Sequence, residues 1–171
     1  MSTWRDEIDI DWPDYAPDEI LRGLHQGGTE DDDRVWIGAP QRTRGRFPFD
    51  LVVTLYADAT PVPWGVQEIR FGFYDAALDE SQVGRIIAIA RAAHRAWRAG
   101  DTVLIRCQAG INRSGLVTAL VLMIEGYTAH EAVALIRARR GRKVLCNEHF
   151  EEWLLTRAAD CLDPMTDSNA A

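Results

Sequence analysis

Short apolar runs alternate with longer amphipathic segments along most of this chain. The runs are rich in β-branched residues and bounded by turn signals, and they predict strands over residues 50–56, 66–73 and 102–106. Apolar residues at helical spacing or density predict helices over residues 81–97, 116–124, 128–139 and 147–159. This alternation predicts one α/β domain, with a central, mostly parallel, twisted sheet of about four to five strands flanked by helices.

The segment between the strand ending at Arg106 and the next helix carries the chemistry. Cys107 and Arg113 are separated by five residues, among them Gly110. A turn from a strand into a helix presents free backbone N–H groups and the positive end of a helix dipole, which together bind a dianion such as phosphate. The same groups would stabilise a Cys107 thiolate, and the Arg113 guanidinium suits two phosphate oxygens. The segment predicts a phosphate site with a cysteine nucleophile.

A family resemblance rests on the run Cys107-Gln-Ala-Gly-Ile-Asn-Arg-Ser-Gly115, with a strand before it and a helix after it. This run resembles the signature loop of the cysteine-dependent protein tyrosine phosphatase superfamily, most closely that of the dual-specificity branch. Residues 20–28 also resemble the first strand and turn of the dual-specificity fold. The resemblance implies a phosphatase that needs no metal or cofactor and acts on phosphotyrosine, and on phosphoserine or phosphothreonine, through a cysteinyl-phosphate intermediate.

The resemblance also assigns roles within this phosphate loop. Cys107 is expected to be the nucleophile. Ser114 is expected to help the thiolate leave, although it also suits a cap of the following helix. Phosphate oxygens are expected to be bound by the Arg113 side chain and by the backbone N–H groups of Gln108, Ala109, Gly110, Ile111, Asn112 and Arg113.

A carboxylic acid is expected to protonate the leaving group, which contributes about 10²–10⁴-fold to the rate. Asp75 lies 32 residues before Cys107 on a loop after a predicted strand, where the resembled family places its general acid. We predict Asp75 for this role. Asp79 is a reserve that also suits the start of the next helix. Asn147, in a segment that resembles the family's Asn-x-x-Phe, is expected to support the structure.

Two residues complicate this assignment. One departs from the usual pattern of the family, and the other is common in a different group of enzymes of the same superfamily. Arg106 precedes the nucleophile where the family usually has His, so its charge must find an acidic partner or reach solvent. Asn112 occupies a position where RNA 5′-triphosphatases of the superfamily commonly have Asn. Two alternatives therefore stay open beside the protein phosphatase, namely an RNA 5′-phosphatase and a phosphate-binding pseudophosphatase.

The charge of the chain is concentrated at its N-terminal end. Residues 1–33 carry eleven acidic and two basic residues, so the other 138 residues hold 15 acidic and 17 basic ones. We divide the chain into an acidic arm (1–19), a catalytic domain (20–160) and a polar tail (161–171). The acidic balance makes nucleic acid and anionic membranes unlikely partners, which favours a phosphorylated protein or peptide. A loop with alternating Arg42, Arg44 and Arg46 is either solvated or a rim that steers phosphorylated ligands.

Cysteine usage and hydropathy predict the compartment. The chain has three cysteines, which is too few and an odd number for a disulfide framework. No apolar run approaches the roughly 18–20 residues of a membrane span, and the acidic N-terminus lacks the pattern of a signal peptide. These features predict a cytoplasmic protein.

Overall fold

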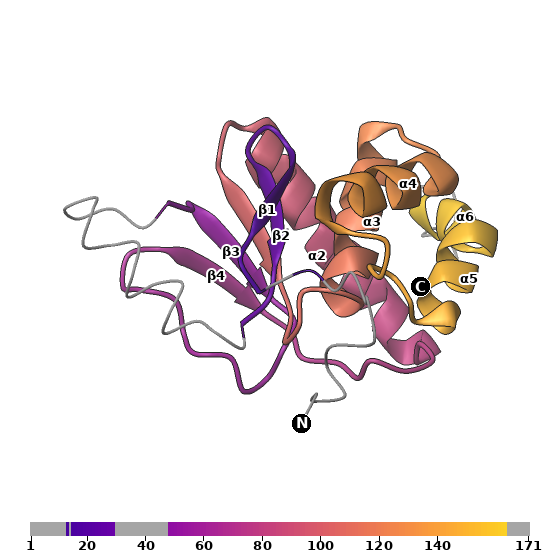
Figure 1. Ribbon diagram of the computed structural model, residues 1–171, viewed down its shortest axis with the longest axis horizontal. Helices are drawn as coiled ribbons and strands as arrows, with labels where there is room; N and C mark the ends of the chain where they lie inside the picture. The colour runs from indigo at the N-terminus through magenta and orange to yellow at the C-terminus, as the bar shows by residue number, and fades with distance from the viewer. Residues whose placement is uncertain (1–12, 14, 30–47, 164–171) are drawn as a thin grey trace, which may run out of the picture.

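A five-stranded sheet forms the centre of the fold, and the described helices all cover one of its faces (Figure 1). The computed structural model describes residues 13, 15–29 and 48–163. The strands are β1 (Asp18–Leu21), β2 (Leu24–Gly27), β3 (Leu51–Thr54), β4 (Gln67–Arg70) and β5 (Val103–Arg106). Across the sheet they follow the order β1-β2-β5-β3-β4, and only the β1–β2 pair is antiparallel. The predicted α/β domain with a mostly parallel sheet is confirmed.

The helices follow the predicted order. They are α2 (Glu80–Arg98), α3 (Arg113–Glu125), α4 (Ala129–Arg140), α5 (Glu148–Thr156) and α6 (Ala158–Leu162). Side-chain caps mark the starts of α2, α4 and α5. The Thr128 hydroxyl accepts a hydrogen bond from the Glu131 N–H, and the Glu131 carboxylate accepts one from the Thr128 N–H, which completes a capping box at the start of α4. In the described part of the chain, no helix is long and apolar enough to cross a bilayer.

The inner strands are buried on both faces, as expected for parallel strands. In β3 and β5, Val53 and Ile105 belong to the large core formed with the helices. Val52 and Leu104, one position earlier in each strand, point to the other face and form a smaller cluster with Phe49. This second face carries the polar side chains described below near the ends of the strands.

Two elements differ from the prediction. The segment 20–28 was expected as one strand and a turn, but it holds parts of two strands, because Gly23 has a φ of +82° that reverses the chain between β1 and β2. The predicted helix over 147–159 is broken at Arg157, whose φ of −130° ends α5. No Gly or Pro marks this break, and the Arg157 guanidinium instead pairs with Glu80 of α2.

The register of the sheet aligns the carboxyl ends of its parallel strands. Gly27 of β2 lies beside Arg106 of β5, Arg106 beside Thr54 of β3, and Thr54 beside Arg70 of β4. The segments that follow these four residues therefore leave the sheet at one edge. Ligands of open parallel sheets bind at such an edge.

Candidate active site

Cys107 lies directly after β5 at this edge and is only 2 % exposed. Residues 108–112 turn the chain into α3, so the predicted strand–loop–helix arrangement is present. The helix begins at Arg113, three residues before the expected Leu116. The hydrophobic pattern missed this first turn because Arg, Ser and Gly contribute no apolar periodicity to it.

Ser114 lies in the buried first turn of α3, with its Oγ 3.3 Å from Cys107 Sγ. In this contact the neutral thiol donates to the hydroxyl, whereas a thiolate would accept from it. The cap position of α3 belongs to Asn112, which makes no side-chain hydrogen bond to the first turn. The first N–H groups of a helix have no intrahelical acceptors, so these donors are available to an anion.

The Arg113 guanidinium is anchored by the backbone that follows two other strands. Its Nη1 donates to the carbonyl of Leu55 at 3.4 Å and to that of Phe73 at 3.1 Å. The guanidinium carbon also lies 5.4 Å from the centroid of the Tyr56 ring. Among the described residues, the buried Nε of Arg113 has no hydrogen-bond partner. A buried charged donor without an acceptor is costly, and an oxyanion is the ligand that satisfies it.

Two side chains that the sequence analysis did not select orient the loop at Gly110. Arg140 Nε and Gln26 Nε2 both donate to the Gly110 carbonyl, at 2.7 and 3.0 Å. Because a trans peptide is planar, this carbonyl direction sends the N–H of Ile111 the opposite way. The buried charge of Arg140 is balanced by Asp18, whose carboxylate accepts from Nη1 at 2.7 Å. These contacts hold one peptide of the loop in a single orientation.

Gly110 is the point of closest approach between the phosphate loop and β2. Its φ is +71°, and a Cβ there would lie 2.4 Å from the carbonyl carbon of Gly27 and 2.5 Å from Arg140 Nη2. We expect Gly110→Ala to cost about 1–2 kcal/mol for the left-handed backbone and about 1–3 kcal/mol for overpacking. The displaced loop should also bind inorganic phosphate more weakly. Thermal unfolding and calorimetry measure both effects.

Gly84, in the middle of α2, provides the matched control. A Cβ at Gly84 would meet nothing within 4 Å, and its backbone is helical. Gly84→Ala should therefore stabilise the protein by about 0.5–1 kcal/mol and leave phosphate binding unchanged. Equal Tm values for the two variants would contradict the close approach at Gly110.

Asp75 lies on the loop after β4, and both of its carboxylate oxygens accept hydrogen bonds from amides. Asn112 Nδ2 donates to Oδ2 at 2.9 Å, and Asn147 Nδ2 donates to Oδ1 at 2.7 Å. The two asparagines are also joined, because the Asn147 backbone N–H donates to Asn112 Oδ1 at 3.0 Å. Asn147 therefore contacts both the phosphate loop and Asp75. The phosphate loop and the start of α5 together hold Asp75.

Asp79 has a different position, as the N-cap of α2. Its carboxylate accepts hydrogen bonds from the Ser81 hydroxyl at 2.8 Å and from the Ser81 N–H at 2.9 Å. These two bonds hold the pKa of Asp79 below its ordinary value, and the bond from the hydroxyl has the larger effect. Asp79 does not line the pocket that Asp75 and Arg113 line.

The site opens into a pocket of about 490 Å³. Asp75, Gln108 and Arg113 line it, together with the aromatic residues Tyr56, Phe73 and Tyr74. Residues 108–112 carry no charge, so Arg113 is the one cationic side chain of the phosphate loop. Among the described residues, no three or more His, Cys, Asp or Glu side chains lie together as a metal site.

Several other expectations concern residues that are not part of the candidate site. Arg42, Arg44 and Arg46 lie outside the described residues, as do most of the acidic arm and of the tail. The other two cysteines are unpaired, Cys146 on the surface and Cys161 half-buried. Arg106 is buried and has found the acidic partner it needs, Glu68, 3.4 Å away.

Comparisons with known proteins agree with this architecture. Residues 78–159 match the family model described as the dual specificity phosphatase catalytic domain. None of the curated proteins compared with the chain matches it. Human DUSP28 shares 20 % identity, with 85 % of this chain and 94 % of that chain covered and a TM-score of 0.67.

Two further solved structures are similar. OH1 from the Orf virus, described as a tyrosine phosphatase, shares 20 % identity over 88 % of this chain and 90 % of that chain, with a TM-score of 0.64. A human tyrosine phosphatase-like serine/threonine/tyrosine-interacting protein shares 18 % identity over 86 % and 98 % of the two chains, with a TM-score of 0.66. At these identities the similarity shows the fold.

Proposed function

Because residues 78–159 of this chain match the dual specificity phosphatase catalytic domain, we propose that the protein belongs to that family and hydrolyses phosphomonoesters through a cysteinyl-phosphate, without a metal ion or cofactor. The proposed substrates are phosphotyrosine, and phosphoserine or phosphothreonine, in proteins. The observation that carries the proposal is the buried Nε of Arg113, which lacks a partner among the described residues. Arg113 lies in the first turn of α3, beside Ser114, whose Oγ is 3.3 Å from Cys107 Sγ. A guanidinium and a thiol so placed suit a phosphate dianion and its nucleophile.

In the first proposed step, the Cys107 thiolate attacks phosphorus. The S–P bond forms while the P–O bond to the leaving group breaks, and the acid form of Asp75 gives its proton to the departing oxygen. Arg113 and the N–H groups of residues 108–113 bind the other three oxygens and stabilise the charge of the transition state as fixed dipoles.

In the second step, water attacks phosphorus and the S–P bond breaks. Asp75, now a carboxylate, takes a proton from the water, and inorganic phosphate is released. Ser114 Oγ, 3.3 Å from Sγ, is placed to donate a hydrogen bond to the thiolate as it leaves.

The asparagines beside Asp75 support its assignment as the acid. Amide donors occupy one acceptor site on each carboxylate oxygen, which fixes the plane of the group relative to the phosphate loop. Each oxygen has a second lone pair, so the group can still carry or accept a proton toward the pocket. An acid held in place in this way avoids the loss of orientation that slows proton transfer.

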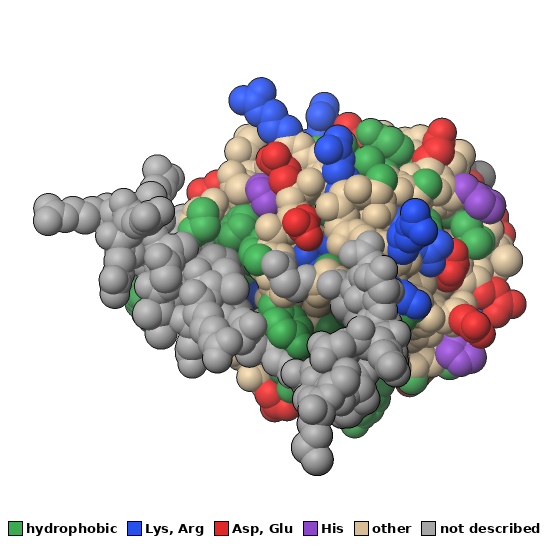
Figure 2. Space-filling view, in the orientation of Figure 1, with side chains coloured by type: hydrophobic (Ala, Val, Ile, Leu, Met, Phe, Trp, Pro, Cys, Tyr) green, Lys and Arg blue, Asp and Glu red, His purple; other side chains and the backbone are tan. Residues whose placement is uncertain are grey.

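Surface charge supports a protein substrate over RNA. Figure 2 shows Lys and Arg side chains interspersed with Asp and Glu side chains on the described part of the face in view. The chain as a whole has a formal charge of −7. Binding to an RNA backbone favours a basic stripe. In addition, Asn112, the residue that suggested an RNA 5′-phosphatase, is engaged with Asp75.

A comparison of three substrates tests the proposal, with a metal chelator present throughout. A phosphotyrosyl peptide, a phosphoseryl peptide and RNA with a 5′-triphosphate are assayed for phosphate release. We expect turnover of at least one phosphopeptide and none of the RNA. Turnover confined to the RNA would favour the RNA 5′-phosphatase. Phosphate binding without turnover of any substrate would favour a pseudophosphatase.

A further inference from the structure

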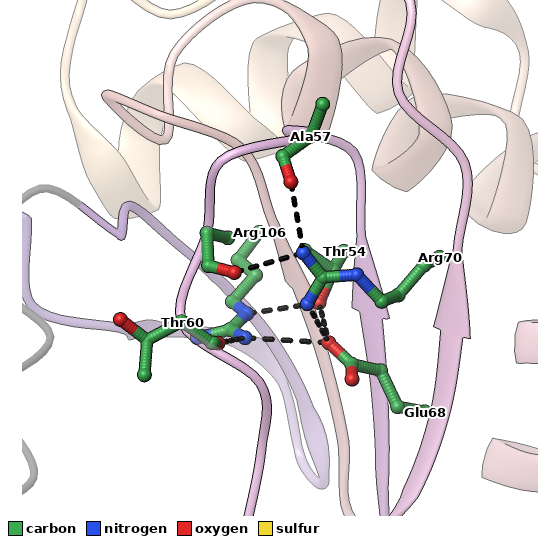
Figure 3. Close-up of polar contacts among 7 residues, drawn as sticks. Thr54, Ala57, Thr60, Glu68, Arg70 and Arg106 are labelled. Atoms are coloured by element: carbon green, nitrogen blue, oxygen red, sulfur yellow. Dashed lines mark hydrogen bonds and ion pairs between the residues drawn. The ribbon is translucent and has the colours of Figure 1, made fainter.

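Arg106, the residue directly before Cys107, is a fully buried arginine that is only 1 % exposed. Its guanidinium reaches across the sheet on the face away from the helices (Figure 3). Nε donates to Thr54 Oγ1 at 3.0 Å, and Nη2 donates to the Thr60 carbonyl at 2.7 Å and lies 3.4 Å from Glu68 Oε1. A guanidinium does not lose its proton in a protein, so burial at this position requires compensating partners.

Glu68 supplies the compensating charge. Its side chain is 13 % exposed and accepts a hydrogen bond from Thr54 Oγ1 at 2.6 Å. Burial acts to raise the pKa of Glu68, but the Thr54 hydrogen bond and the charges of Arg70 and Arg106 outweigh it and hold that pKa below its ordinary value. Thr54 thus bridges the two charged groups, accepting from one and donating to the other. All three strands involved, β5, β3 and β4, are adjacent in the sheet.

A second arginine extends this network to the loop after β3. Arg70 Nη1 pairs with Glu68 at 3.0 Å, and Arg70 Nη2 donates to the carbonyls of Ala57 and Ala59 at 3.1 and 2.8 Å. With the bond from Arg106 to Thr60, two guanidiniums hold three carbonyls of one four-residue stretch (Figure 3). The stretch also bonds to the residue before it, since the Ala59 N–H donates to the Tyr56 carbonyl at 3.3 Å.

The stretch held in this way forms a wall of the active-site pocket. Tyr56, Ala57 and Asp58 line the pocket on this side. The two residues just before the held stretch support Arg113, Leu55 through its carbonyl and Tyr56 through its ring. The network of Arg106, Glu68 and Arg70 is therefore connected, through at most a few residues of backbone, to the guanidinium proposed to bind phosphate.

We propose that Arg106, Glu68 and Arg70 form a clamp that positions the 55–60 wall and, through it, the Arg113 guanidinium for phosphate binding. These three are positioning residues, since none of them needs to touch the substrate. The inference rests on the proposed function, because it assigns the clamp a role in the same pocket. A purely structural role would stabilise the fold without changing the affinity of the site.

Two variants distinguish a positioning role of the clamp from a purely structural one. Glu68→Gln removes the charge that both arginines share, and Thr54→Val removes only the bridging hydroxyl. A misplacement of about 1 Å costs up to 10²-fold in an active site, so we expect the Kd of inorganic phosphate to rise by about 10-fold or more in Glu68→Gln and less in Thr54→Val. Amide hydrogen exchange should accelerate over residues 55–60 in both variants.

Glu125→Gln is the matched control. Glu125 also contacts two side chains, His94 at 2.7 Å and Arg98 at 3.4 Å, but it ends α3 about 18 Å along the helix from Arg113. This variant should lower Tm and leave the Kd of phosphate at the wild-type value. Faster exchange over residues 55–60 with an unchanged Kd in Glu68→Gln would overturn the clamp's role in binding. A wild-type protein that binds no phosphate would instead refute the proposed function.

Discussion

Replacing Cys107 with Ser is expected to abolish hydrolysis of a simple aryl phosphate, measured with a metal chelator present. The thiolate is the nucleophilic form of cysteine and is accessible near neutral pH, whereas a serine hydroxyl requires activation by a neighbouring base. A hydrolase that loses its nucleophile loses about 10⁶-fold in kcat, so turnover should fall to the background rate. Release of the aryl alcohol, followed by absorbance, is the measurement.

Binding should survive the same substitution. Ser replaces one buried atom, and the contacts of Arg113 with Leu55 and Phe73 do not involve the thiol. Calorimetry with inorganic phosphate should therefore give a Kd close to that of the wild type. Cys146→Ser is the control, because this cysteine is exposed and lies outside the pocket lining. It should keep full activity, and turnover persisting in Cys107→Ser would show that another group is the nucleophile.

Replacing Asp75 with Asn is expected to have the second largest effect, and only on substrates with poor leaving groups. General acid catalysis contributes about 10²–10⁴-fold, so hydrolysis of a phosphoseryl peptide should slow by a factor in that range. Nitrophenyl phosphate should be affected far less, because nitrophenolate leaves without protonation. The ratio of the two kcat values in each variant measures the effect independently of the amount of folded protein.

Asp79→Asn is the matched control for the acid. Asn is as good an N-cap as Asp, so the start of α2 should be retained. We expect both substrates to keep their wild-type rates in this variant. Equal slowing of both substrates in Asp75→Asn would argue for a role of Asp75 in structure or binding, and selective slowing in Asp79→Asn would move the acid to that residue.

Much of the fold follows from local patterns in the sequence. The apolar run before Cys107 and the Thr128–Glu131 capping box correspond to β5 and to the start of α4. Both signals lie within a few residues of the element they mark, as do hydrophobic periodicity and capping in general. Prediction failed where a local signal was absent or had two interpretations, as at the break after Thr156 and at the turn of Gly23.

The candidate site likewise combines residues that local patterns place together with residues that only distant packing brings in. Strand, loop and helix place Cys107, Ser114 and Arg113 together because they are at most seven positions apart. The groups that orient them come from far along the chain. Gln26 is 84 positions from the carbonyl it binds at Gly110, and Asn147 is 72 positions from Asp75. Such pairs depend on the packing of whole elements, which no local pattern encodes.

By itself, the sequence determined the α/β architecture, the phosphate loop and the candidate nucleophile, because short-range spacing and residue type are sufficient for each. Only the tertiary structure showed what holds Asp75 in place and what the buried Arg106 binds. The first depends on the two asparagines that meet its carboxylate, and the second on a glutamate two strands away in the sheet. Both are consequences of the strand order and register, through which the chain brings distant polar groups close enough to satisfy one another's buried charge and hydrogen bonds.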